Sequence, residues 1–82
     1  MLPKVTEAQI AEWRGTNHPY KIAAAHIAEW ALKQERGTAL PANEFFAGDL
    51  GIVASDSAWK RAKVFLKTTG VLYQGDGPYQ VA

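Results

Sequence analysis

The chain of 82 residues contains no cysteine, and this absence narrows both its chemistry and its means of stabilisation. Without cysteine it can form neither a disulfide framework nor a thiolate metal site, so packing must stabilise the fold. It also lacks an apolar run approaching the ~20 residues that a membrane-spanning helix needs, and no signal-peptide pattern opens it. These absences predict one small cytoplasmic domain with a single modest core.

An excess of charge of one sign is missing as well. The formal net charge is +1 at pH 7, so the whole molecule offers no argument for a polyanionic partner. Any such argument depends on where the charges lie along the chain. Apolar side chains, in contrast, make up 48% of the residues, which predicts a folded globule rather than a disordered segment.

Catalytic and metal-binding patterns are also missing. His18 and His26 are too far apart to form a helical metal pair, and the glutamates are spread over helical surfaces instead of being paired. The pattern of Gly75 and Gly77 is too short for a phosphate-binding loop. We therefore expect no enzymatic activity, no metal and no cofactor.

Capping residues, prolines and glycines divide the chain into helices followed by a hairpin. Thr6 and Gln9 form a capping-box pattern at the start of a first helix, and Pro19 fits the first turn of a second. Near the C-terminus, the β-prone segments "VLYQ" and "YQVA" flank the turn "GDGP" and predict a hairpin. The expected elements are helices over residues 6–15, 19–36, 41–50 and 55–69 and a hairpin over residues 71–82.

Apolar spacing predicts a core-facing side for the two longer helices. At about 100° per residue, each set of apolar positions falls within a sector of about 120°. In the second helix the set is Tyr20, Ala23, Ala24, Ile27, Trp30 and Ala31. In the fourth helix it is Ala58, Trp59, Ala62, Phe65, Leu66 and Thr69. Phe45, Phe46 and Leu50 supply the apolar side of the third helix.

The order of these elements indicates a fold class. Two helices joined by a tight turn and followed by a two-stranded hairpin form the plan of a winged helix-turn-helix. The expected fold is therefore mainly α with a C-terminal β-hairpin, with an extra N-terminal helix over residues 6–15.

Roughly from residue 20 to residue 82, the chain also resembles the winged-helix DNA-binding domain of GntR-type regulators. In that family a Leu-Pro opens the second conserved helix, a Leu-Gly-Val enters the turn, a serine begins the recognition helix, and the wing ends in Gly-x-(aromatic)-Val. The residues that carry the resemblance are Leu40, Pro41, Leu50, Gly51, Ile52, Ser55, Ala62, Leu66, Gly70, Val71, Leu72, Gly77, Tyr79 and Val81.

The chain departs from the family in four respects. Asp56 stands where the family often has a base-reading arginine, the wing "YQGDGPYQ" has no lysine or arginine, and the turn before Ser55 is longer. The effector-binding domain of such regulators is not expected either. The resemblance therefore implies a stand-alone regulator of the phage or plasmid type, without a small-molecule effector.

The resemblance implies double-stranded DNA as the partner, bound by the helix over residues 55–69. The expected contact residues are Ser55, Asp56, Ser57, Lys60, Arg61, Lys63, Lys67 and Gln74. The cationic side chains would neutralise phosphates, while those at the helix start would approach base edges in the major groove. The alternative is that Ser55 or Asp56 only caps the helix and the lysines form a solvated face.

Two functional hypotheses follow. The first is a sequence-specific DNA-binding protein acting as a homodimer, for which Ile10 and Trp13 are candidate interface residues, although Trp13 could equally fasten the first helix to the core. The second is a protein–protein interaction module that keeps the winged-helix scaffold without binding DNA. The low net charge, Asp56 and the acidic wing tip at Asp76 favour the second.

Overall fold

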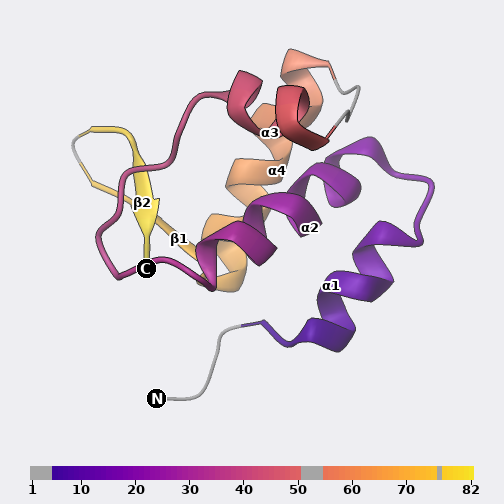
Figure 1. The fold of residues 1–82 in the computed structure, drawn as a ribbon, viewed down its shortest axis with the longest axis horizontal. Coiled ribbons are helices and arrows are strands. Elements are labelled where there is room, and N and C mark those ends of the chain that lie inside the picture. Colours follow the sequence, from indigo (N-terminus) through magenta and orange to yellow (C-terminus); the bar gives the residue numbers. More distant parts are fainter. Residues whose placement is uncertain (1–4, 51–54, 76) are drawn as a thin grey trace.

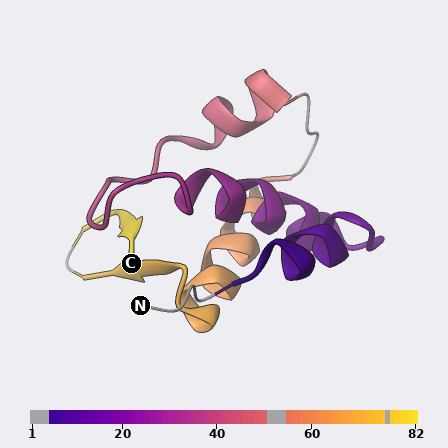
Figure 2. The same cartoon turned by 60° about the horizontal axis from the view of Figure 1, so that its bottom comes forward.

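Helix α2 runs through the middle of the molecule, with α1 and α4 packed against it (Figure 1). The computed structural model describes residues 5–50, 55–75 and 77–82 of the chain. In chain order the elements are α1 (Glu7–Arg14), α2 (Pro19–Ala31), α3 (Asn43–Leu50), α4 (Asp56–Thr69), β1 (Leu72–Gln74) and β2 (Tyr79–Val81). Figure 2 shows α3 above α2, with α1 and α4 below it and the hairpin at one end.

The first two helices begin where the local sequence predicts. The backbone N–H of Gln9 donates to the Thr6 hydroxyl (3.2 Å), and the Thr6 N–H donates to the Gln9 side chain (2.9 Å), so the capping box is formed. Pro19 occupies the first turn of α2, where its missing N–H leaves no intrahelical bond unmade.

The end of α2 differs from the sequence prediction, which extended this helix to residue 36. The helix ends at Ala31, and turn hydrogen bonds follow from the Lys33 N–H to the Trp30 carbonyl (3.1 Å) and from the Gln34 N–H to the Ala31 carbonyl (3.0 Å). Gly37 does not cap a helix but sits in a turn at φ 89°, a conformation that glycine adopts without strain.

The reason for this early end lies in the sheet. The Gly37 N–H donates to the Val81 carbonyl (2.8 Å), the Val81 N–H donates to the Thr38 carbonyl (2.9 Å), and Leu40 bonds likewise to Tyr79 (2.9 Å). A helical backbone over residues 32–36 would turn the chain away from β2, so this long-range pairing overrides the helical tendency of the segment.

The two strands form an antiparallel hairpin in which Leu72 pairs with Val81 and Gln74 with Tyr79. Residues 37–40 cover the other edge of β2, with Ala39 opposite Gln80, so β2 is hydrogen-bonded on both sides. The coarse fold class is therefore confirmed: the described chain is mainly helical and ends in a two-stranded hairpin.

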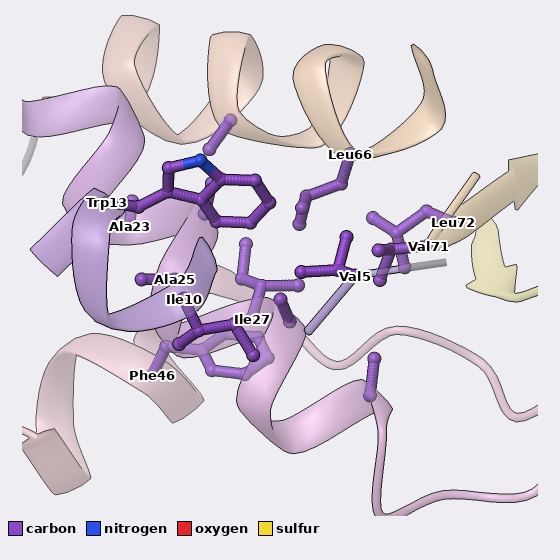
Figure 3. Close-up of a cluster of buried hydrophobic side chains, with 14 of the residues drawn as sticks. Val5, Ile10, Trp13, Ala23, Ala25, Ile27, Phe46, Leu66, Val71 and Leu72 are labelled. Carbon is purple, nitrogen blue, oxygen red and sulfur yellow. The ribbon is translucent and has the colours of Figure 1, made fainter. Parts of the chain in front are cut away.

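One apolar core lies between α1, α2, α4 and the hairpin, and α3 contributes Phe46 to it (Figure 3). Its largest fully buried side chains are Phe46, Ile27, Leu66 and Val5. Buried alanines of α2 let neighbouring helices approach closely, and they include Ala25 and Ala28, which the sequence analysis did not assign to the core. A wider part of α2 is buried than one apolar stripe because elements pack on more than one of its sides.

Helix α3 also departs from expectation. It begins at Asn43, after the predicted residue 41. Its adjacent phenylalanines separate: Phe46 is 1% exposed, whereas Phe45 is 45% exposed and contacts Trp30 edge-on. Trp30 itself is only half-buried, because it lies at the margin of the core against these two rings. The side chain of Leu50, the third predicted apolar residue here, lies outside the described residues.

None of the described helices combines the length and the apolar content that crossing a bilayer requires.

Candidate functional site

Helix α4 carries most of the residues that the sequence analysis assigned to a binding site. It begins at Ser55, whose hydroxyl accepts a hydrogen bond from the Ala58 N–H (3.2 Å). It ends at Gly70, at φ 88°, where the N–H groups of Gly70 and Val71 donate to the carbonyls of Lys67 (3.2 Å) and Leu66 (2.9 Å) in a Schellman arrangement. Residues close in sequence therefore determine both ends of α4, and Gly70 turns the chain toward β1.

The two faces of α4 have different surroundings. Trp59, Ala62 and Leu66 are buried in the core, as predicted. Half-buried residues border them, and the remaining residues form what we call the outer face of α4. The outer face consists of the exposed residues Asp56, Ser57, Lys60, Arg61, Val64, Lys67 and Thr68. This face is cationic, with a single carboxylate at its N-terminal end.

The predicted cations do not share one position on the helix. Lys60, Arg61 and Lys67 belong to the outer face, whereas Lys63 is half-buried at its border with the core. The sequence analysis had grouped Lys63 with Lys60 and Lys67. At about 100° per residue, Lys63 lies on the Trp59 side of that group, which explains its partial burial. Its long methylene chain can cover apolar surface while the ammonium group reaches water.

Arg61 is held by an aromatic contact. Its guanidinium carbon lies 4.2 Å from the centroid of the Tyr20 ring, within cation–π range. The Tyr20 ring in turn meets Phe65 edge-on at 5.8 Å, and Phe65 meets Trp13 at 5.0 Å. This row of rings fastens α1 and the first turn of α2 to α4, and it places the guanidinium beside the outer face.

Ser55, Asp56 and Ser57, the predicted base-reading residues, are all exposed. Their roles in the fold differ, because Ser55 is the N-cap and its hydroxyl already accepts the Ala58 N–H. Asp56 follows in the first turn, where its negative charge is favourable beside the helix N-terminus. The cap therefore belongs to Ser55, and the carboxylate of Asp56 makes no hydrogen bond to a described residue.

The hairpin places its predicted contact at the other end of the helix. Gln74 is exposed at the end of β1, beyond the C-terminus of α4, while Ser55 and Asp56 lie at the opposite end (Figure 1). The two parts of the predicted site are therefore not brought together. Asp76, the acidic wing tip, lies outside the described residues.

The candidate dimer residues of α1 lie inside the core. Ile10 is 5% exposed and Trp13 is 9% exposed. Figure 3 shows the Trp13 ring among the core side chains next to α4. Of the two roles considered for Trp13, its burial and its contact with Phe65 fit the one that fastens α1 to the core.

Sequence reasoning missed two exposed side chains near the candidate site. Val64 is 49% exposed on the outer face, and Tyr73 is 58% exposed on β1. A helical wheel of α4 predicts that Val64 is exposed, because this position lies outside the apolar sector. Tyr73 was detectable from strand alternation, since its neighbour Leu72 faces the core.

A groove between α1 and α2 was also missed. It measures about 430 Å³ and is lined by Ile10, Ala11 and Leu32 together with charged residues. Across it Arg14 forms an ion pair with Glu29, and the ammonium group of Lys33 lies 4.0 Å from the same carboxylate. The groove forms between two helices whose lining residues lie apart in the sequence, so no local sequence pattern predicts it.

The candidate surfaces differ in which charged groups they bring together. Among the described residues there is no group of three or more histidine, aspartate or glutamate side chains arranged to hold a metal ion. The described ion pairs join Glu29 to Arg14 and Lys33, so no described carboxylate forms an ion pair with a cation of α4. No family model matches the chain, and neither a curated protein nor a solved structure matches it.

Proposed function

We propose that the protein binds double-stranded DNA by inserting α4 into the major groove, as a small transcriptional regulator of the winged helix-turn-helix type. The observation that carries this proposal is the outer face of α4, where Lys60, Arg61 and Lys67 are exposed without a carboxylate partner among the described residues. A net charge of +1 does not argue against it, because only the local charge of the contact face matters here.

The geometry of the helix suits a groove. The B-DNA major groove is about 12 Å wide and admits one α-helix, with phosphates along both walls. Lys60 and Lys67 lie to one side of the outer face, and Arg61 lies to the other. A helix with cations on both flanks can contact both phosphate walls at once, which a helix with a single basic stripe cannot.

The arrangement around α4 supports the winged-helix assignment. A helix, α3, precedes α4 in the chain, and the hairpin follows it directly through Gly70. Residues 37–40, which lie before α3, add a further extended segment to the hairpin. The polar Gln74 on this hairpin is the candidate wing contact. We further propose that the protein acts as a homodimer, because one such helix covers only a short half-site.

The salt dependence of binding tests the proposal. Affinity is measured by fluorescence anisotropy, at several salt concentrations, for duplexes taken from the sequence flanking the gene and for a random duplex pool. DNA binding should weaken steeply with salt because bound counterions are released. The double variant Lys60→Gln/Lys67→Gln should bind more weakly and reduce the log–log salt slope by about two.

A matched control separates local contacts from total charge. Lys33 is exposed just after the end of α2, beside Glu29, so Lys33→Gln removes a charge outside the outer face of α4. This variant should leave the salt slope nearly unchanged. The proposal is wrong if no duplex binds at low salt, or if Lys33→Gln changes the slope as much as one of the α4 substitutions does.

A protein-interaction module is the second candidate, and the groove between α1 and α2 favours it. Leu32 is 44% exposed at this groove, and the nearby charges of Arg14, Glu29 and Lys33 would form a polar rim around an apolar centre. Leu32→Lys should abolish association with a protein partner while leaving duplex binding unchanged, so the two functions can be tested on separate surfaces.

A further inference from the structure

The outer face of α4 has an apolar side chain at its centre. Val64 is 49% exposed, and no contact with the core accounts for its position. On the helical wheel it lies within about 15° of the direction opposite to the buried residues Trp59, Ala62 and Leu66. If α4 enters a groove with its core face outward, Val64 points at the groove floor from the middle of the helix, as Ser57 does two turns earlier.

Cations stand on both sides of this valine. Lys60 and Lys67 lie about 40–60° to one side of Val64, and Arg61 lies about 60° to the other. The stack on Tyr20 holds the Arg61 guanidinium at that flank. Charge complementarity therefore points to a polyanion as the occupant of this face, with its anionic groups at the flanks and uncharged groups at the centre.

The polar neighbours of Val64 limit what else the centre can recognise. The Thr68 hydroxyl donates to the Val64 carbonyl (3.1 Å), so its proton is used within the helix. Ser57 lies two turns earlier, about 10 Å along the axis, and would meet a different base pair. The centre of the outer face therefore presents only the apolar side chain of Val64 to the groove. Among the base edges of the major groove, the C5-methyl of thymine is the apolar group that such a side chain can contact.

We infer that Val64 contacts the C5-methyl group of a thymine, and that this contact contributes a T·A preference at one position of each half-site. This inference rests on the proposed DNA binding and adds a specificity-determining residue to it. The lysines cannot supply such a preference, because contacts to phosphates carry no direct sequence information.

Replacing thymine by deoxyuridine removes the methyl group and nothing else, so it tests the contact directly. Duplexes are first selected from a random pool with the unaltered protein, and each thymine of the selected site is then replaced in turn. One replacement should weaken binding by about three- to fourfold, as expected for the loss of one buried methyl group. For Val64→Ala the same replacement should change affinity by less than about 1.5-fold, because the partner of the methyl group is gone.

Lys67→Gln serves as the matched control. It should lower the affinity for thymine and deoxyuridine duplexes equally, leaving their ratio as in the unaltered protein. Val64 is exposed, so Val64→Ala should remain folded, which circular dichroism checks.

The outcomes are distinguishable. If no deoxyuridine replacement matters, or if its effect is the same in Val64→Ala as in the unaltered protein, the thymine contact is refuted while DNA binding stands. If the selection recovers no duplex, the proposed function itself fails, and the assignment of Val64 fails with it.

Discussion

The guanidinium carbon of Arg61 on α4 lies 4.2 Å from the centroid of the Tyr20 ring in the first turn of α2. The same ring meets Phe65 edge-on at 5.8 Å, so one tyrosine contacts both a core-side aromatic and an outer-face cation. Arginine suits this position because its planar guanidinium stacks on a ring and still presents N–H groups at its edge. The contact couples the packing of α2 on α4 to the charge pattern of the candidate interface.

Tyr20→Leu tests this coupling. The variant loses the cation–π contact and the edge-on pair with Phe65, which together should lower the free energy of unfolding by about 1–2 kcal/mol in urea denaturation. Tyr20→Phe keeps the ring and is the control, with an expected loss below about 0.5 kcal/mol. A double-mutant cycle with Arg61→Ala should give a coupling energy of about 0.5–1 kcal/mol. Strictly additive losses would show that the stack contributes nothing.

Ser55 and Asp56 should respond differently to substitution. Ser55→Ala removes the cap that accepts the Ala58 N–H and should lower the free energy of unfolding by about 1 kcal/mol.

Asp56→Asn keeps the shape of the side chain but removes its charge. Because Asp56 lies on the flank of Lys60 and Lys67, we expect this variant to bind all duplexes more tightly, by relieving repulsion from phosphate. A loss confined to duplexes with one particular cytosine would instead assign base reading to Asp56.

Trp13 should behave as a core residue. Its ring is 9% exposed and meets Phe65 at 5.0 Å, so Trp13→Ala should lower the free energy of unfolding by about 3–5 kcal/mol. Trp13→Phe keeps an aromatic ring at this site and should lose less than half of that. Sedimentation of Trp13→Phe should match that of the unaltered protein. A stable, folded Trp13→Ala protein whose only change is dissociation of a dimer would show that the residue is an interface anchor after all.

His26 makes stability depend on pH. Burial on α2, reinforced by the positive charge of Arg14 and opposed by Glu29, lowers the pKa of His26 below its ordinary value of about 6.5. The unfolded chain therefore takes up this proton at a higher pH than the folded protein does. The free energy of unfolding should fall as the pH drops below about 6.5, until the folded protein also binds the proton.

The substitution His26→Gln removes this dependence. Urea denaturation at about pH 7.5 and about pH 5.5 should show a smaller loss of stability on acidification in the variant than in the unaltered protein. An equal loss in both would mean that other groups account for the acid sensitivity.

Much of the local structure could be predicted from short-range patterns. The capping box of Thr6 and Gln9, the first-turn Pro19 and the C-terminal Gly70 depend on neighbours within a few residues, and each has the predicted role. The core face of α4 also follows from spacing alone, because an amphipathic helix buries its apolar side against any partner. The end of α2 was less accurate, since residues 37–40, which follow it, pair with β2, a strand distant in sequence.

The features of the candidate site also fall into two groups, those that the sequence predicts and those that depend on tertiary packing. The charges of α4 could be read from the sequence, but the stack of Arg61 on Tyr20 depends on how α2 packs on α4. The placement of Trp13 in the core and the groove beside Leu32 likewise arise where separate helices meet.

By itself, then, the sequence determined the starts of α1, α2 and α4, the hairpin, and the separation of apolar and charged sides on α4. Caps, turns and amphipathic spacing act over a few residues, so they need no knowledge of the rest of the chain. Only the tertiary structure decided where α2 stops, which alanines are buried and that Arg61 stacks on Tyr20. These features come from long-range contacts: residues 37–40 pair with β2, and two neighbouring helices bury α2 on more than one side.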